Sequence, residues 1–250
     1  MKKIITLSLA VASFTFASAQ IKNDRGTFTK PAAKEVAIET KMAVDFNGNG
    51  WFSLSDGILG DLRSTIYPGI FGDPTTTVAA PSLSGASVKV RRFKSDKVAE
   101  RFTANLSFGN NKTNNAGNAE GKDYSKTSFG LSLSYGKEKH FAGAERLSTY
   151  IGWDVTAGVY TAARKDQAGT TTPMTKWSQT SFGLGLQGVT GMDYYVVPKV
   201  YLGVELNYGL NYGHAGKLNV TGDAGTAHET ASSITFTPAM AGSFRMGYRF

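Results

Sequence analysis

Charged residues recur on one face of several segments in which every second residue is apolar or small. Because successive side chains on a strand point to opposite faces, this spacing puts the charges on one side of a sheet and the apolar residues on the other. Charges of both signs on an enclosed face could form a network of ion pairs, or could exchange partners and admit small ions. We predict such a network from Glu39, Lys41, Asp45, Lys89, Arg91, Arg101, Asp154, Glu205 and Arg245.

A second candidate site is the segment from Asp45 to Asp56, which matches the spacing D-x-N-x-N-G of a calcium loop with a carboxylate at the twelfth place. Asp56 stands where such loops carry a bidentate glutamate, and no helical pattern leads into the segment. Asn-Gly pairs are also common in ordinary hairpin loops, where they supply positive φ. We therefore expect no metal here, and calcium binding stays open as the alternative.

Hydrolytic chemistry would need a nucleophile beside a base, and the sequence offers little of either. His140 is expected in a short turn, while His214, Asp223, His228 and Ser232 share one long loop without a nucleophile motif. The chain has no cysteine, which excludes cysteine nucleophiles, thiolate metal sites and disulfides. We predict that the protein is not an enzyme and binds no cofactor.

Eight segments alternate in this way and must position the charged face. One side of each segment is apolar, while the other carries Gly, Ser, Thr, Asn and the charges. Long apolar runs that could form membrane helices are missing after residue 19, as a barrel requires. The predicted strands are 36–46, 84–93, 101–108, 125–136, 147–160, 180–188, 200–213 and 236–250.

Short and long connections between these segments also alternate. Short links are predicted at 94–97, 138–145 and 190–198, and long polar links at 47–81, 110–123, 164–175 and 213–233. Short turns on one rim and long loops on the other are typical of outer-membrane barrels, with the short turns in the periplasm. The predicted fold is therefore an all-β, eight-stranded antiparallel up-and-down transmembrane β-barrel. Side chains nearly fill the interior of a barrel of this size.

The two ends of the chain agree with this fold. Residues 1–19 combine two lysines, an apolar stretch and Ala-Ser-Ala, as in a cleaved secretory signal peptide. We assign 20–33 to a periplasmic N-terminal segment and 34–250 to the barrel. Aromatic residues near both ends of the strands, among them Trp177 and Tyr195, are predicted to form interfacial girdles.

The net charge of +8 makes the chain basic. A basic surface could contact nucleic acid or the phosphates of anionic lipid, or it could simply be solvated. An exported protein rarely meets nucleic acid, and no nucleic-acid motif is present. We therefore expect outer-membrane lipid and lipopolysaccharide as neighbours, and no nucleic acid.

The signal peptide, the eight strands and the aromatic terminus resemble small OmpA/OmpX-type barrels. RRFKSDKVAERFTANLSFG and YYVVPKVYLGVELNYG are similar to outer-membrane barrel-domain proteins of Bacteroidetes-type bacteria. The resemblance implies a location in the cell outer membrane, with periplasmic chaperones and the barrel-assembly machinery as partners during biogenesis. It also implies that this machinery reads the terminal strand, through Phe244, Met246, Tyr248 and Phe250.

Two functions follow as expectations. The first is a structural or interaction barrel that presents its extracellular loops on a lumen filled with side chains. The alternative is a small, porin-like channel for ions or small solutes.

Overall fold

A computed structural model describes residues 30–31, 34–42, 58–66, 70, 83–113, 122–141, 143–168, 174–222 and 231–250. The predicted signal peptide and the Asp45–Asp56 motif lie outside these residues, so both remain predictions. None of the helices in these ranges is long and apolar enough to cross a bilayer.

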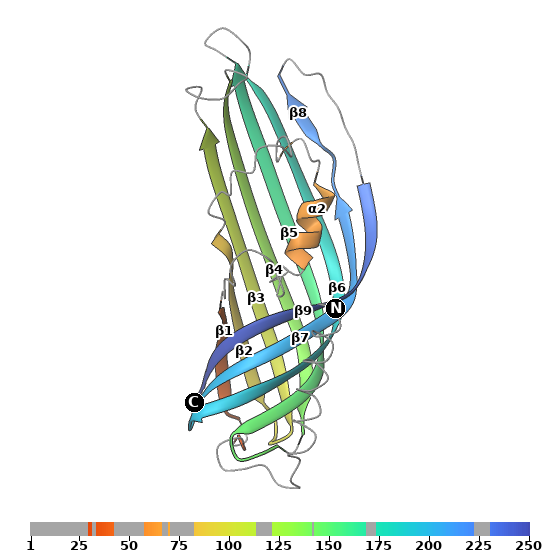
Figure 1. The fold of residues 1–250 in the computed structure, drawn as a ribbon. Helices are drawn as coiled ribbons and strands as arrows, with labels where there is room; N and C mark the ends of the chain where they lie inside the picture. Colours follow the sequence, from red (N-terminus) through yellow and green to blue (C-terminus); the bar gives the residue numbers. More distant parts are fainter. Residues whose placement is uncertain are drawn as a thin grey trace, which may run out of the picture.

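Strands dominate the described chain, and one short helix accompanies them (Figure 1). In chain order the elements are β1 (Val36–Met42), α2 (Ile58–Thr65), β2 (Leu83–Phe93), β3 (Val98–Thr113), β4 (Lys122–His140), β5 (Leu147–Ala168), β6 (Thr175–Val197), β7 (Val200–Ala215), β8 (Asn219–Thr221) and β9 (Ala231–Arg249).

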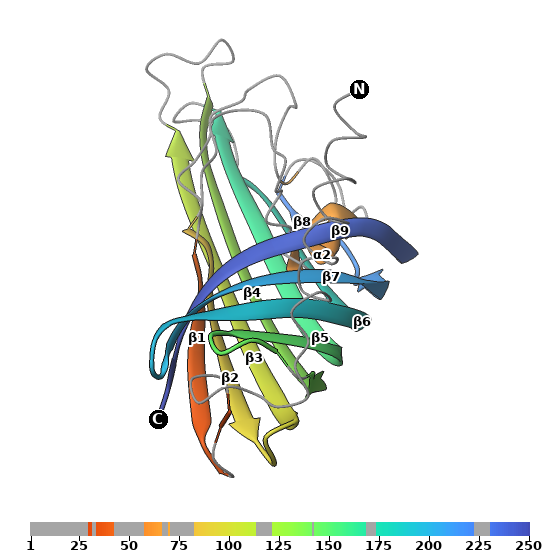
Figure 2. The same cartoon turned by 60° about the horizontal axis from the view of Figure 1, so that its bottom comes forward.

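Eight of the strands form a closed ring. Each pairs antiparallel with the next along the chain from β1 to β7, β7 pairs with β9, and β9 pairs back with β1. The short β8 adds only to β6, beyond the ring. Figure 2 shows β6, β7 and β9 crossing in front of β1 to β5, as the two walls of a barrel do. The predicted eight-stranded antiparallel barrel is therefore confirmed.

Turns at the two ends of the barrel differ in length. One end holds the turn after β2, the turn after β4, the two-residue turn Pro198–Lys199 and the C-terminus, and we call it the short-turn end. The other end, here the long-loop end, holds every connection that was predicted to be long. Lys199 adopts φ 78°, the left-handed conformation that lets β6 reverse directly into β7.

Two of the turns are shorter than predicted. Strand β4 runs on to His140 and β6 runs on to Val197, so the first three residues of the predicted link 138–145 and nearly all of the predicted link 190–198 are strand. The alternation continues through both regions, and Glu138 and Asp193 consequently face the lumen. The prediction ended the alternating pattern at both places, whereas the backbone pairing of the ring continues through them.

The outward face of the ring is apolar. Exposed large side chains on this face are expected where a barrel meets hydrocarbon, because burial in lipid replaces burial in a core. They include Ile38, Phe102, Leu106, Phe108, Phe129, Leu133, Val155, Phe182, Leu184, Leu186, Leu202, Leu210 and Met246.

The predicted aromatic girdles hold only in part. Phe102 lies against Tyr135, whose ring meets Trp153 edge-on, and these outward rings form a continuous ladder over β3 to β5. Trp177 and Tyr195 were assigned wrongly, since both point into the barrel. Trp177 packs on a buried apolar cluster, and Tyr195 is buried against Tyr201. Their positions in the alternation are inward, and aromatic type alone does not decide the face.

Candidate functional site in the charged lumen

A network of buried charged side chains crosses the lumen near the short-turn end. All eight strands of the ring contribute, because each has an inward position within a few residues of this end. We call it the charge network and define it by nine residues, four cations and five carboxylates. They are Glu39, Lys89, Arg91, Arg101, Glu138, Asp154, Asp193, Glu205 and Arg245.

Arg91 of β2 is one hub of this network. Its guanidinium lies 3.0 Å from Glu138 of β4 and 2.7 Å from Asp193 of β6, and its Nε contacts Glu39 of β1. The Tyr201 ring covers the guanidinium, with its centroid 5.0 Å away. This one planar cation thus links β2 to three other strands, to β4 and β6 through charge-assisted hydrogen bonds and to β1 through an ion pair.

Glu205 of β7 is the corresponding anionic hub. Its carboxylate accepts hydrogen bonds from Lys89 at 2.7 Å, from Arg101 at 2.9 Å and from Tyr150 at 2.8 Å. Arg101 also lies 3.0 Å from Asp154 and 3.2 Å from Glu138. Lys89 and Arg101 therefore share one carboxylate, and Arg101 is further balanced by two other acids.

Arg245 of β9 completes the ring of contacts. It bonds Glu39 and the Tyr150 hydroxyl, and lies 3.0 Å from Asp193. Gly203 on the neighbouring strand leaves room for this, because a Cβ there would lie 2.8 Å from the Arg245 guanidinium and 2.8 Å from the Asp193 carboxylate. The small inward residue Gly203 of β7 is thus part of the site.

Apolar layers bound the network at both ends of the lumen. At the short-turn end lies the cluster Ala37, Phe93, Ala99, Tyr195 and Tyr201. Toward the long-loop end come polar pairs such as Asn105 with Ser132 at 3.0 Å, and then helix α2.

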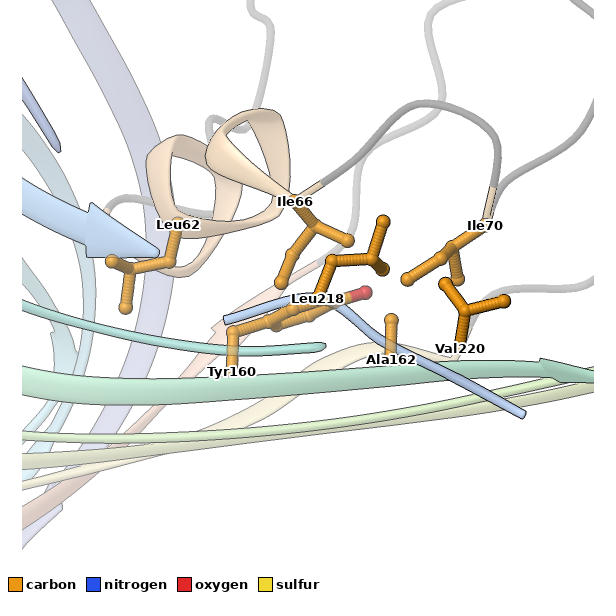
Figure 3. Close-up of a cluster of buried hydrophobic side chains, with 7 residues drawn as sticks. All are labelled: Leu62, Ile66, Ile70, Tyr160, Ala162, Leu218 and Val220. Carbon is orange, nitrogen blue, oxygen red and sulfur yellow. The ribbon is translucent and has the colours of Figure 1, made fainter. Parts of the chain in front are cut away.

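Helix α2 lies against the inner wall and forms the second apolar layer. Leu62 and the following Ile66 and Ile70 pack with Tyr160, Ala162, Leu218 and Val220 (Figure 3). The Ser181 hydroxyl donates to the Leu62 carbonyl at 3.0 Å. Gly183 faces the helix, since a Cβ there would lie 2.9 Å from a methyl of Leu62. The long connection 47–81 was predicted as a polar loop, and this part of it is instead packed in the barrel.

The structure brings together seven of the nine residues predicted for the network. Lys41 is in register with Arg245, but its side chain and the whole of Asp45 lie outside the described residues. The prediction missed Glu138 and Asp193, which it placed in turns. Continuing the period of two through both segments would have identified them.

The chain matches a known protein family over most of its barrel. The model of the OmpA-OmpF-like porin family matches residues 95–250, which is more than half of the sequence. The chain belongs to this family. Searches among curated proteins and among solved structures gave no match. Family membership supports an outer-membrane, porin-like β-barrel, in agreement with the closed ring and its apolar outer face.

His140 lies in the lumen of this porin-family barrel, and its predicted place in a turn is wrong. Its ring lies 2.9 Å from Glu138 and, on the other side, 2.9 Å from the Ser148 hydroxyl. This order of serine, histidine and carboxylate is the one hydrolases use. However, Ser148 has 0% exposure, so no substrate can reach its oxygen. The three side chains extend the charge network, and porin-like family membership speaks against an enzyme.

The remaining histidine prediction also changes. His214 is part of β7, where its ring lies 5.1 Å from that of Phe182 on the outward face. Asp223 and His228 lie outside the described residues, and Ser232 is in β9. Within the described ranges, no group of three His, Asp or Glu side chains could hold a metal ion.

Proposed function

We propose that this porin-family barrel is a closed, structural or interaction protein that presents its long loops at the cell surface. The observation that carries the proposal is the charge network, which spans the lumen with contributions from every strand of the ring. A conducting pore needs a continuous path for water and ions through this level.

Burial of the network supports closure. Arg91, Arg101 and Arg245 have relative exposures of 0–1%, and Glu39 and Glu205 have 1% and 2%. Because these side chains are almost inaccessible to solvent, no continuous water-filled path runs past them. The three arginines each pair with several acids, so moving one arginine aside would leave those acids buried without a partner, at a cost of several kcal/mol.

Helix α2 supports the same conclusion at the other end of the lumen. Leu62 has 0% exposure and lies among inward side chains of β5 and the segment leading into β8. Ions avoid apolar constrictions because these cannot replace the lost hydration. We therefore propose that the lumen is closed at two levels, by the charge network and by the apolar layer around helix α2.

Conductance across planar lipid bilayers tests the proposal. Purified, refolded protein is expected to give no steps, whereas a general porin in the same chamber gives them. A variant that lacks residues 58–66 is expected to stay silent as well, because the charge network remains. Regular conductance steps from the unaltered protein, with amplitudes that rise with the salt concentration, would contradict the closed barrel and establish a channel.

The variant that lacks residues 58–66 distinguishes the contribution of helix α2 to closure from that of the charge network. Steps that occur only without residues 58–66 would show that α2 alone closes the lumen, which would contradict the role proposed for the network. A folded band before boiling in SDS gels confirms that each preparation contains the barrel.

A further inference from the structure

Three lysines form a row on the outward face at the long-loop end of the barrel. The register pairs Lys112 of β3 with Ser125 of β4, Ser125 with Lys165 of β5, and Lys165 with Lys176 of β6. These positions lie at one level across four neighbouring strands. We call Lys112, Lys165 and Lys176 the lysine row.

The row points away from the lumen. Lys112 is in phase with the outward Phe108, which is 56% exposed, and Lys176 is in phase with the outward Phe182, which is 52% exposed. All three lysines are exposed. Between them and the apolar band lie small polar residues such as Thr161 and Thr180, whose hydroxyls are 3.0 Å apart.

No described carboxylate forms an ion pair with the lysine row. Asp166, the sequence neighbour of Lys165, bonds Arg164 at 2.6 Å. Lys165 and Lys176 are direct cross-strand partners, an arrangement of like charges that destabilises a sheet unless an anion lies between them.

The opposite rim differs in this respect. There the register places Glu100 between Arg92 and Lys137 on the outward face, so the charges alternate in sign. Glu100 also lies 3.2 Å from Lys94. The short-turn rim thus supplies its own counter-charge, whereas among the described side chains no acid does so for the lysine row.

The distance between the two rims matches a membrane. On β4 the row passes through Ser125, and the opposite rim passes through Lys137, twelve positions away. At about 3.3 Å per residue and a tilt of about 40°, this is roughly 30 Å along the barrel axis. The hydrocarbon core of a bilayer is about 30 Å thick, so the row lies at the level of the lipid headgroups.

We infer that the lysine row binds the phosphate groups of lipid headgroups in the outer leaflet. Each ammonium offers three donors to phosphate oxygens, and Ser125 in the row adds a hydroxyl. The phosphate would lie between side chains of adjacent strands, while the acyl chains lie on the apolar band below it. Binding of this kind would neutralise the repulsion between Lys165 and Lys176.

The test uses diphosphorylated lipid A and its dephosphorylated form as probes. Full-length refolded protein in neutral detergent is titrated with each probe, and the bound lipid is measured by native mass spectrometry. The unaltered protein is expected to prefer the phosphorylated form. The triple variant Lys112→Gln, Lys165→Gln and Lys176→Gln is expected to bind it at least about tenfold more weakly, because each lysine near an anionic headgroup contributes measurably.

The matched control removes charge from the other rim through Arg92→Gln and Lys137→Gln, and should leave the affinity unchanged. Equal binding by the triple variant and the unaltered protein would overturn the inference. Equal weakening by the two sets of substitutions would also overturn it, because it would indicate a general attraction to the basic protein. Displacement of the lipid by inorganic phosphate alone would reassign the row to free phosphate.

Discussion

Lys89 and Glu205 form an ion pair across the lumen, with Nζ 2.7 Å from Oε1 and 2.9 Å from Oε2. Their strands, β2 and β7, are not neighbours, since β1 and β9 lie between them in the ring. The pair therefore connects two parts of the wall that backbone hydrogen bonds do not join. Contacts of this kind stabilise the barrel from its interior, in addition to the backbone hydrogen bonds of the wall.

Replacing Glu205 by glutamine should strongly destabilise the barrel. The substitution removes the charge that Lys89 and Arg101 share and leaves both cations buried. Breaking a buried pair by removing one partner costs about 3–5 kcal/mol. Denaturant unfolding in lipid vesicles, followed by tryptophan fluorescence, measures the change. Glu100→Gln at the rim is the control and should cost less than about 1 kcal/mol. Equal losses for the two variants would contradict a stabilising network.

Replacing Leu62 by alanine should release α2 from the inner wall. The fully buried side chain fills space beside Gly183, and truncating a buried leucine costs about 2–5 kcal/mol. Trypsin cleavage after Arg63 then becomes at least about tenfold faster, because cleavage follows the population of the open form. Leu184→Ala, the same truncation on the outward face, should not change this rate. Unchanged cleavage in Leu62→Ala would mean that the helix does not depend on this contact.

Replacing Leu184 by arginine tests whether the outward face meets hydrocarbon. Leu184 is 56% exposed and lies within the apolar band of β6. An arginine facing lipid near the bilayer midplane costs about 2–4 kcal/mol, and the cost falls toward zero near the interface. Thr127→Arg, on the outward face of β4 close to the long-loop end, is the matched control. Unfolding from vesicles should separate the two variants, and identical stabilities would argue against a membrane-embedded band.

Truncating Phe250 should impair assembly in cells more than stability. The ring is 52% exposed, while the backbone of Phe250 keeps its hydrogen bonds to Val36 at 3.0 and 3.2 Å. Phe250→Ala is therefore expected to refold in vitro with a stability change below about 1 kcal/mol. In cells, the amount in the outer membrane should fall several-fold if the assembly machinery reads this residue. Tyr208→Ala, which truncates another exposed outward ring, controls for a general loss of aromatic surface.

The sequence by itself determined the number of strands in the ring, the face of most strand residues and the alternation of short and long connections. These properties are local, because a period of two assigns each side chain to one side of its own strand. At Glu138 and Asp193 the prediction was wrong because it ended the strand too early. The period of two continues through both residues in the sequence.

Only the tertiary structure decided which charges meet. Lys89 finds Glu205 because closure of the ring brings β2 opposite β7, and no local pattern specifies that distance. The same holds for α2, whose Leu59 and Leu62 repeat with helical spacing together with Ile66 directly after the helix. A helix of eight residues is marginal alone, and it is stable here because the inward surface around Tyr160 and Gly183 buries one side of it.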